Sequence, residues 1–314
     1  MMITAISTTH DELEDVYKRI APYIHRTPIL TSQSLNKIAG CELFFKCENF
    51  QKIGAFKARG AANAILNLGD EQQKKGVATH SSGNHGQAVA YVAQQFGIPA
   101  YIVMPENAPL VKKNAVLGYG ALVTECRSTL QAREEMLEAV TAETQANFIP
   151  PYDHRDIILG QSSASKEVFD ELNELDYLIT PVGGGGLLSG AAIAREFFSP
   201  NTHIIGAEPE RADDAYQSFK SGQHILPENP DTVADGLRTA LGKLNFEVIK
   251  EGVDDILLAS EQEILDAQLL IMQRMKIVVE PSSAVPLAVV LKNRDVFEAK
   301  RVAIIVSGGN VDRV

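Results

Sequence analysis

Short apolar runs alternate with amphipathic helical patterns along most of the chain. The runs ELFFKCE, PAYIVMP, ALVTEC, DYLITPV, HIIGAEP and RVAIIVSGG are each typical of a buried strand. Between them, segments such as GNHGQAVAYVAQQFG, PLVKKNAVLGYG and STLQAREEMLEAVTAET repeat apolar residues at helical spacing. Strands that alternate with helices predict parallel sheets covered by helices on both faces, which is the α/β class.

One stretch of this pattern is dense enough to form a unit of its own. From residue 75 to residue 147 the chain makes a continuous run of three strand and helix pairs. We therefore predict a small inserted α/β domain over 75–147. The remaining segments, 1–74 and 148–314, then form one large discontinuous domain.

Composition excludes several classes of partner. The 314 residues carry a formal charge of -11, and no basic run is present, which argues against nucleic-acid binding. No apolar run is long enough to span a bilayer, and the N-terminal segment is typical of a capped helix rather than a signal peptide. Cys41, Cys47 and Cys126 form no paired framework, so a reducing cytoplasm is the expected setting.

The stretch NFQKIGAFKARGAANAIL places Lys57 among small and apolar residues. An amine in such surroundings has a lowered pKa and can attack a carbonyl group to form a Schiff base. The alternative is a lysine whose ammonium group reaches the surface along an apolar stem.

Four consecutive glycines, Gly183, Gly184, Gly185 and Gly186, follow a predicted strand and precede a predicted helix. Glycines let backbone N–H groups approach an anion closely, and the helix N-terminus adds a positive dipole. The run lacks the spacing of nucleotide-binding glycine motifs, so it predicts a simple phosphate site. A tight turn is the alternative interpretation.

Three further segments hold polar side chains at turns. Ser81, Ser82, Asn84 and His85 precede a helix and could bind a carboxylate, although a cap by Asn84 or Ser82 would explain the same residues. Glu208, Asp213 and Asp214 supply hard oxygen ligands that suit Mg²⁺ or Ca²⁺, unless the loop is simply solvated. Ser307 follows the last strand and is either a turn residue or a ligand hydroxyl.

Taken in order, KIGAFKARGA, SSGNHGQA, GGGGLLSG, GAEP and SGGN resemble the fold-type II pyridoxal-phosphate enzymes, in the serine racemase and serine/threonine dehydratase branch. The resemblance runs from Lys52 to Asn310. CENFQKIGAFK, PPYDH and MKIVVEP place it near the serine racemases and the 3-hydroxyaspartate dehydratases. It implies two domains of the tryptophan synthase β type, each with a mostly parallel twisted sheet, and a homodimer.

The resemblance also implies a role for each motif. Lys57 carries pyridoxal 5'-phosphate and acts as general base, and Ser82 acts as a second acid/base on the opposite face. Phe56 packs near the cofactor ring, Asn84 binds its phenolic oxygen, the glycines Gly183 to Gly186 bind its phosphate, and Ser307 faces its pyridine nitrogen. The substrate is held by Ser81, Ser82, Asn84 and His85.

Two further ligands are implied in the same way. In the racemases a Glu, a backbone carbonyl and an Asp bind a divalent cation, and these positions match Glu208, Ala212 and Asp214. The positions that contact a nucleotide in the animal enzyme resemble Ser32, Arg274 and Lys276, which implies ATP as an activator. One departure is GQSS at Gly160 to Ser163, where the family has GQGT.

The implied activity is racemisation of serine and α,β-elimination of serine or threonine to a 2-oxo acid and ammonia. A 3-hydroxyaspartate dehydratase is the alternative, because Arg238 or Arg133 could pair with a second carboxylate. A β-replacement synthase of the same fold and a non-catalytic binding protein for pyridoxal phosphate are more distant alternatives.

Overall fold

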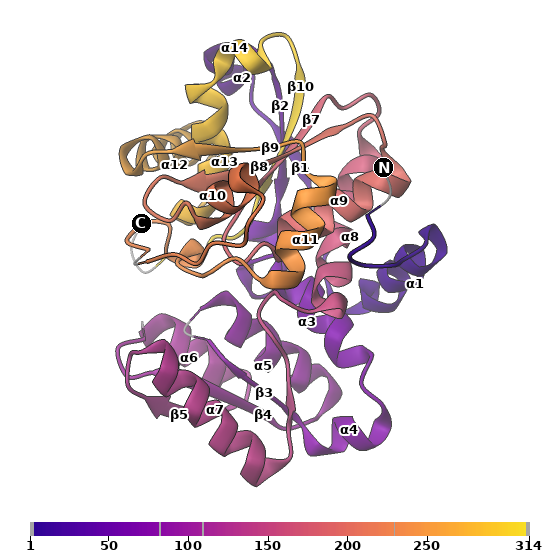
Figure 1. Cartoon of the computed structure of the whole chain (residues 1–314), viewed down its shortest axis with the longest axis vertical. Coiled ribbons are helices and arrows are strands. Elements are labelled where there is room, and N and C mark those ends of the chain that lie inside the picture. The colour runs from indigo at the N-terminus through magenta and orange to yellow at the C-terminus, as the bar shows by residue number, and fades with distance from the viewer. Residues whose placement is uncertain (1–2, 82, 109, 229, 312–314) are drawn as a thin grey trace.

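Two separate sheets form the framework of the protein (Figure 1). The computed structural model describes residues 3–81, 83–108, 110–228 and 230–311. Its strands are β1 (Ile29–Thr31), β2 (Glu42–Cys47), β3 (Val77–His80), β4 (Ala100–Pro105), β5 (Leu122–Cys126), β6 (Asn147–Phe148), β7 (Tyr177–Pro181), β8 (His203–Pro209), β9 (Asp255–Ala259) and β10 (Arg301–Val306). Its α-helices are α1 (His10–Ile20), α2 (Gln33–Ala39), α3 (Lys57–Leu66), α4 (Asp70–Lys75), α5 (Asn84–Phe96), α6 (Leu110–Gly118), α7 (Leu130–Thr144), α8 (Arg155–Glu171), α9 (Gly186–Phe198), α10 (Asp214–Ser221), α11 (Lys243–Gly252), α12 (Glu261–Met275), α13 (Pro281–Lys292) and α14 (Arg294–Phe297).

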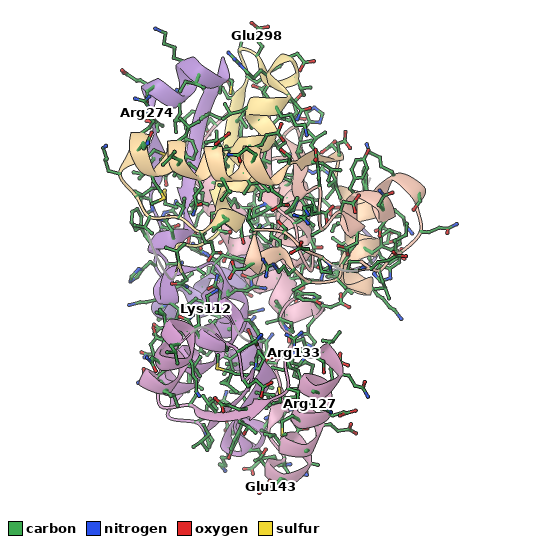
Figure 2. All side chains as sticks on the ribbon, turned by 90° about the vertical axis from the view of Figure 1, so that its left-hand side faces the viewer. Lys112, Arg127, Arg133, Glu143, Arg274 and Glu298 are labelled. Carbon is green, nitrogen blue, oxygen red and sulfur yellow. The ribbon has the colours of Figure 1, made fainter. Side chains whose placement is uncertain are left out.

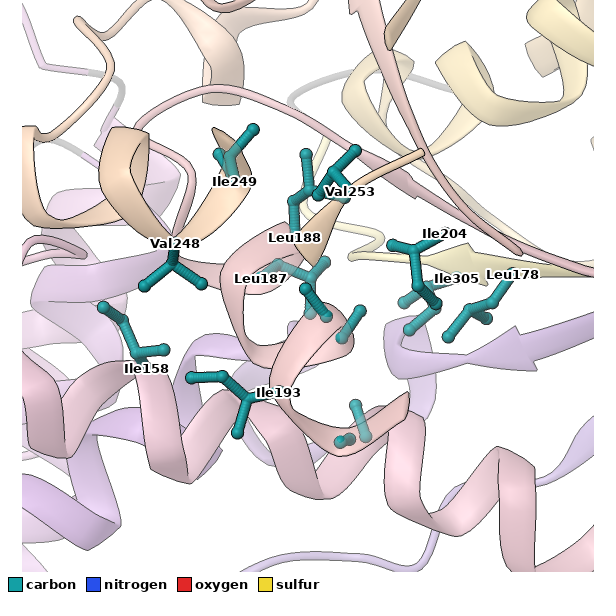
Figure 3. Packing of buried hydrophobic residues seen from close by; sticks show 14 of the residues in the cluster. Ile158, Leu178, Leu187, Leu188, Ile193, Ile204, Val248, Ile249, Val253 and Ile305 are labelled. Atoms are coloured by element: carbon teal, nitrogen blue, oxygen red, sulfur yellow. The ribbon is translucent and has the colours of Figure 1, made fainter. Parts of the chain in front are cut away.

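The larger sheet has six strands in the order β1-β2-β10-β7-β8-β9. Every neighbouring pair is parallel except β1 and β2, which are antiparallel. One face packs against α8, α9 and α11 through a cluster that includes Ile158, Leu188 and Val248 (Figure 3). The other face is covered by α12 and α13, through residues such as Ile264 and Leu287. The prediction of a parallel sheet with helices on both faces is thus confirmed.

The smaller sheet has four parallel strands in the order β5-β4-β3-β6. We call these strands with α5, α6 and α7 the small-sheet region, and the six-stranded sheet with its covering helices the large-sheet region. Figure 1 shows the small-sheet region at the lower end of the molecule. The domain boundaries at 75 and 147 stay a prediction.

Local capping explains where several helices begin and end. Thr9 caps α1 by accepting a hydrogen bond from the Glu12 amide, 3.2 Å from its hydroxyl oxygen. Gly97 ends α5 in the left-handed conformation, with φ of 64°, which glycine adopts without strain. Ser260 and Glu263 form a reciprocal capping box at the start of α12.

Helix α3 is fixed from beneath by a buried ionic cluster. The Arg59 guanidinium donates from Nε to Glu48, at 2.7 Å, and from Nη1 to Glu167, at 2.9 Å. Lys46 also donates to Glu167, and the side chains of all four residues are fully buried. Removing one member of such a cluster typically costs about 3–5 kcal/mol, because its partner stays buried and unpaired. The cluster therefore anchors the helix that begins at Lys57.

The GQSS departure lies where α8 crosses α3. A Cβ atom added at Gly160 would approach the Cα atom of Gly60 to 2.7 Å, so the two backbones touch there. Ser163 accepts a hydrogen bond from Arg59 at 3.2 Å. The second serine of GQSS thereby joins the cluster under α3.

None of the helices within the described ranges is sufficiently long and apolar to cross a membrane.

Candidate active site

Lys57 is the first residue of α3, and its amine lies between two aromatic rings. Nζ is 5.1 Å from the centroid of the Phe56 ring and 5.8 Å from that of Tyr152. It donates a hydrogen bond to the Pro151 carbonyl at 2.7 Å. Burial lowers the pKa of Lys57 to about 8, and the charge of Glu280 opposes that shift. A useful fraction of the amine is therefore unprotonated near neutral pH, as a nucleophile or base requires.

The glycine run connects β7 to α9 and lies beside the same tyrosine. A Cβ atom at Gly184 would overlap the Tyr152 ring, and one at Gly185 would lie 2.7 Å from the Cβ atom of Asn245. Gly185 also has φ of 92°, which other residues rarely adopt. Both positions therefore require glycine.

The backbone of this run has the donors that a phosphate needs. Among the described residues, the N–H groups of Gly183, Gly184 and Gly185 donate no hydrogen bond. Unpaired amides of this kind are rare in folded proteins. The N-terminus of α9 follows directly at Gly186, so its dipole adds to the attraction for an anion. These residues fit the phosphate of pyridoxal phosphate.

The turn before α5 brings Asn84 to the site. The residue that caps α5 is Gly83, which makes no side-chain capping bond, so the alternative of a cap by Asn84 is wrong. Asn84 instead donates from Nδ2 to both carboxyl oxygens of Glu280, at 3.1 Å each, and accepts from Asn310 at 2.9 Å. The Ser81 hydroxyl accepts from the Gly83 amide at 3.2 Å. Ser82 lies outside the described residues.

His85 is buried and neutral. Its Nε2 atom is 2.9 Å from the Ile149 carbonyl oxygen, which can only accept, so Nε2 carries the hydrogen. Burial lowers the pKa of His85 to about 3, and the charge of Lys57 adds to the shift. The buried Nδ1 atom has no hydrogen-bond partner within the described chain. Its free lone pair suits a hydroxyl or ammonium group better than a carboxylate.

Ser307 follows β10 and is tied to the start of α3. Its carbonyl accepts from the Phe56 amide at 3.0 Å, and its buried hydroxyl lies 3.0 Å from that of Ser283. The hydroxyl can still rotate to donate or accept a further hydrogen bond. Ser307 is thus close to Lys57, as the motif order predicts.

Sequence reasoning missed Glu280, although MKIVVEP was noted for its resemblance. Glu280 precedes α13 and is 3% exposed. Burial raises its pKa to about 7, while the hydrogen bond from Asn84 opposes the shift. The available signal for Glu280 was a carboxylate placed directly before an apolar helix. Its partner, Asn84, lies 196 residues away along the chain, so the sequence does not show the contact.

The acidic loop places two carboxyl groups out of contact with solvent. Glu208 is fully buried at the end of β8 and accepts from the Ala215 and Tyr216 amides, at 3.0 and 2.7 Å. Asp214 accepts from the Leu241 amide at 2.7 Å. Burial raises the pKa of Glu208 well above its usual value and that of Asp214 to about 6, and the charge of Asp214 adds to the shift at Glu208.

A cation would relieve the repulsion between these two carboxylates, so their chemistry fits Mg²⁺ or Ca²⁺. The described residues contain no group of three His, Cys, Asp or Glu side chains able to hold a metal ion. Backbone carbonyls such as that of the buried Ala212 would have to complete the coordination.

The two candidate arginines differ in what they contact. Arg238 is exposed, and its Nε donates to the Thr232 carbonyl at 2.7 Å. Arg133 is partly buried, and its buried Nε atom has no partner among the described residues. Burial raises the pKa of Tyr152 to about 12, and the charge of Arg133 works against that shift. Figure 2 places Arg133 where the small-sheet region meets the large-sheet region.

The candidate nucleotide residues lie away from Lys57. Arg274 and Lys276 are exposed at the end of α12, which packs against α2, and Figure 2 shows Arg274 at the upper end of the molecule. Ser32 caps α2, because its hydroxyl accepts from the Leu35 amide at 3.4 Å.

Comparison with known proteins shows the family of the chain. The family model described as "Pyridoxal-phosphate dependent enzyme" matches residues 20–308. The chain is 49% identical to the beta-hydroxyaspartate dehydratase of Paracoccus denitrificans, covering 97% of this chain and 96% of that protein. It is also 49% identical to the serine racemase of Dictyostelium discoideum, covering 98% and 96%. The crystal structure of a T.th. threonine deaminase superposes with a TM-score of 0.93 at 42% identity, covering 98% of this chain and all of that one. The chain belongs to the family of pyridoxal-phosphate dependent enzymes.

Proposed function

We propose that the protein is a lyase and racemase that acts on β-hydroxy amino acids. It racemises serine, and it eliminates water from serine or threonine. A water molecule then hydrolyses the resulting enamine, which releases ammonia and leaves a 2-oxo acid. The observation that carries this proposal is the amine of Lys57, with its lowered pKa, beside the Tyr152 ring that also packs against Gly184 of the glycine run.

When bound, pyridoxal phosphate withdraws electrons from the α-carbon of an amino acid and makes its α-proton acidic. Lys57 takes that proton at Nζ, because its pKa lies near the operating pH. His85 accepts a hydrogen bond at Nδ1 from the substrate hydroxyl or ammonium group, while the Ser81 hydroxyl donates to the carboxylate. Ser307 offers a neutral hydroxyl to the ring nitrogen, which favours elimination over transamination.

Ser82 holds the proton for the opposite face of the α-carbon. This role rests on its place in the SSGNH motif and on the relatives that are serine racemases. One lysine fixed at a helix start would reach one face of the substrate α-carbon, so racemisation needs a second proton donor.

A panel of substrates tests the main proposal. Serine, threonine and 3-hydroxyaspartate are each supplied to the enzyme with pyridoxal phosphate, and the 2-oxo acid and the D-amino acid are both measured. We expect 2-oxo acid from at least one substrate and D-serine from L-serine, with neither from Lys57→Ala. Turnover by Lys57→Ala at the wild-type rate would exclude the assignment, and product formation only with an added sulfur nucleophile would indicate a β-replacement synthase.

A dicarboxylic substrate is the second candidate, and the unpaired Nε of Arg133 favours it. A guanidinium that pairs with a second carboxylate contributes roughly 1.5–3 kcal/mol, or about ten- to hundredfold in kcat/KM. We expect Arg133→Ala to lose that factor for 3-hydroxyaspartate and much less for serine. Arg238→Ala is the matched control and should change neither. Equal losses for both substrates in Arg133→Ala would contradict a role in selectivity.

The acidic loop is proposed to bind Mg²⁺ or Ca²⁺ through Glu208, Asp214 and the Ala212 carbonyl. EDTA should lower the melting temperature and Mg²⁺ should restore it, because the cation compensates two buried negative charges. Glu208→Gln combined with Asp214→Asn should lose the response, whereas Asp231→Asn, at an exposed site, should keep it. A melting temperature that ignores both EDTA and Mg²⁺ in the wild-type protein excludes the site.

Three finer properties complete the proposal. All three cysteines are free and buried, which suits the reducing cytoplasm. A homodimer is supported by exposed apolar side chains four residues apart on α12, Leu265 and Leu269. ATP activation would act at Arg274 and Lys276, and Arg274→Ala should abolish any effect of ATP on activity.

A further inference from the structure

Glu280 is a buried carboxyl group in the middle of the candidate site. A Cβ atom at Gly308 would lie 2.9 Å from its Oε1, and one at Gly236 would lie 3.8 Å from it. Its own amide donates to the Gly308 carbonyl at 3.1 Å, so the residue is fixed next to Ser307. The side chain makes no capping bond to α13. Its carboxyl oxygens instead accept from the Asn84 amide, at 3.1 Å each.

The contact that this carboxyl group makes joins the two regions of the protein. Asn84 opens α5 in the small-sheet region, and Glu280 precedes α13 in the large-sheet region. Asn310 donates to the Asn84 oxygen, at 2.9 Å, and to the Ile53 carbonyl, at 2.8 Å. The amide of Asn84 thus gives its hydrogens to Glu280 and accepts at its oxygen from Asn310. A flip of this amide would place its oxygen against the carboxylate.

Charged groups reach Glu280 from three directions. Gly308 lies against both Glu280 and Ala55, because a Cβ atom there would be 2.9 Å from the Glu280 Oε1 atom and 3.1 Å from the Ala55 Cβ atom. Lys57 follows Ala55 by two residues, so its charge interacts with that of Glu280. Asp235, in the 3-10 helix η4 (Asp235–Leu237), and Lys112 on α6 also act on Glu280 with opposite signs. Lys112 and Asp235 are paired with each other at 2.6 Å, so their effects largely cancel. Lys57 is left as the nearby cation without a carboxylate in direct contact, since its amine bonds to the Pro151 carbonyl.

We propose that Glu280 is a positioning residue of the site, with two effects that act through other side chains. Its carboxyl group fixes the Asn84 amide where the two regions meet, and it places a negative charge near the Lys57 amine. The inference rests on the proposed function only for its catalytic consequence. Both effects exist in the protein without cofactor or substrate.

The two effects can be separated by two substitutions. Glu280→Gln keeps the size and an acceptor oxygen for Asn84 but removes the charge. Glu280→Ala removes both. Glu210→Gln is the matched control, because Glu210 is an exposed carboxylate that pairs with Lys292 away from the site.

The charge effect is measured as the pKa of Lys57 in cofactor-free protein, from the pH dependence of its reaction with an amine-selective reagent followed by peptide mass analysis. Glu280→Gln should lower this pKa by roughly one pH unit, as expected for two charges several ångströms apart in partly buried surroundings. Glu210→Gln should leave it unchanged. An unchanged Lys57 pKa in Glu280→Gln, with a wild-type melting temperature, overturns the charge effect.

The positioning effect is measured as the dissociation constant for pyridoxal phosphate. Glu280→Gln should stay within about threefold of wild type, and Glu280→Ala should bind about tenfold more weakly, as expected for the loss of a hydrogen bond to a charged group. Equal affinity of Glu280→Ala and wild type overturns this effect. In the holoenzyme, the pH at which kcat falls on the acid side should move down in Glu280→Gln. If no amino acid is turned over at all, the proposed function fails while the Lys57 pKa and the cofactor affinity still decide the role of Glu280.

Discussion

Burial of Lys57 lowers the stability of the folded protein, although the same burial gives the amine the lowered pKa that a base requires. Its ordinary pKa of 10.5 falls to about 8 in the folded protein, so the unfolded chain binds more protons between these pH values. The folded protein without cofactor therefore gains stability as pH rises from about 8 to about 10.5. Below pH 8 the full penalty remains, which is at most roughly 3 kcal/mol.

This conflict predicts the behaviour of Lys57→Met. The variant should have no activity. In cofactor-free form at pH 7 its free energy of unfolding, measured by urea titration, should exceed that of wild type by about 1–3 kcal/mol. The difference should shrink at pH 10, because the folded lysine is already neutral there and the pH approaches the unfolded pKa of 10.5, so little of the penalty remains. A difference in free energy of unfolding that is the same at both pH values would show that burial of charge is not its cause.

Ser82 gives the second prediction for a single side chain. Ser82→Ala should stop formation of D-serine from L-serine, because the proton donor for the second face is lost. Elimination from L-serine needs Lys57 alone and should remain within about threefold of wild type, on the scale of small losses that leave the main base intact. Both products are measured in one reaction. Persistent racemisation, or a parallel loss of both products, would assign Ser82 another role.

The residues that could be predicted from the sequence are those whose chemistry is indicated by their neighbours along the chain. Lys57 lies among apolar neighbours, and the glycine run is contiguous, so short windows were enough. Glu280 was missed because its importance depends on Asn84, which folding brings from the other region. The alternative of a helix cap by Asn84 was wrong for the same reason, because the sequence shows the helix start and does not show Glu280.

The turn between β7 and α9 shows how backbone conformation and close packing restrict which residue can occupy a position. Gly185 has φ of 92° and lies against Asn245, so Gly185→Ala has both backbone strain and a close contact. We expect a loss of about 1–3 kcal/mol in stability and weaker binding of pyridoxal phosphate. Gly222→Ala is the control, because Gly222 has φ of 70° but nothing within 4 Å of an added Cβ atom.

Stability and cofactor titrations of both variants separate strain from contact. Gly222→Ala should lose about 1 kcal/mol through its backbone alone and bind cofactor normally. If Gly185→Ala binds the cofactor as tightly as Gly222→Ala does, the glycine run is only a turn.

Elements in which apolar residues recur at regular spacing were predictable, and the short or antiparallel elements were not. HIIGAEP matches β8 from His203 to Pro209, and the helical pattern after Ser128 begins at its cap, Thr129. β1 spans only three residues and pairs antiparallel to β2. A strand this short has too few residues to show alternating apolar and polar positions. Pairing order in the large sheet also depends on contacts between distant segments, such as β2 with β10.

The molecule as a whole holds its site between two sheets. Ser307 follows β10 of the large-sheet region, and Lys57 begins α3. Asn84 and His85 lie on α5 of the small-sheet region. The relative position of the regions therefore decides whether the site is complete. Polar contacts that join them near the site include those of Asn84 with Glu280 and with Asn310, and that of Lys112 with Asp235.

The ion pair between Lys112 and Asp235 gives a prediction for the joined state. Its atoms are 2.6 Å apart, and the side chains are 9% and 43% exposed, so salt and solvent weaken it. A double-mutant cycle with Lys112→Met and Asp235→Asn should give a coupling of about 0.5–1 kcal/mol in the free energy of unfolding at low salt. The coupling should fall at high salt. KM for the substrate should rise several-fold in each single variant, because the small-sheet region is held less firmly over the site, while kcat changes little.

The pair Lys74–Glu71 is the control for this cycle. It has the same 2.6 Å separation but lies within α4, fully on one side of the junction. Its removal should change stability by a few tenths of a kcal/mol and leave KM unchanged. If the Lys112 and Asp235 variants leave KM as the Lys74 and Glu71 variants do, the ion pair does not hold the two regions together. The arrangement of Asn84 over Lys57 would then depend on the contact with Glu280 and on apolar packing between α3 and α5.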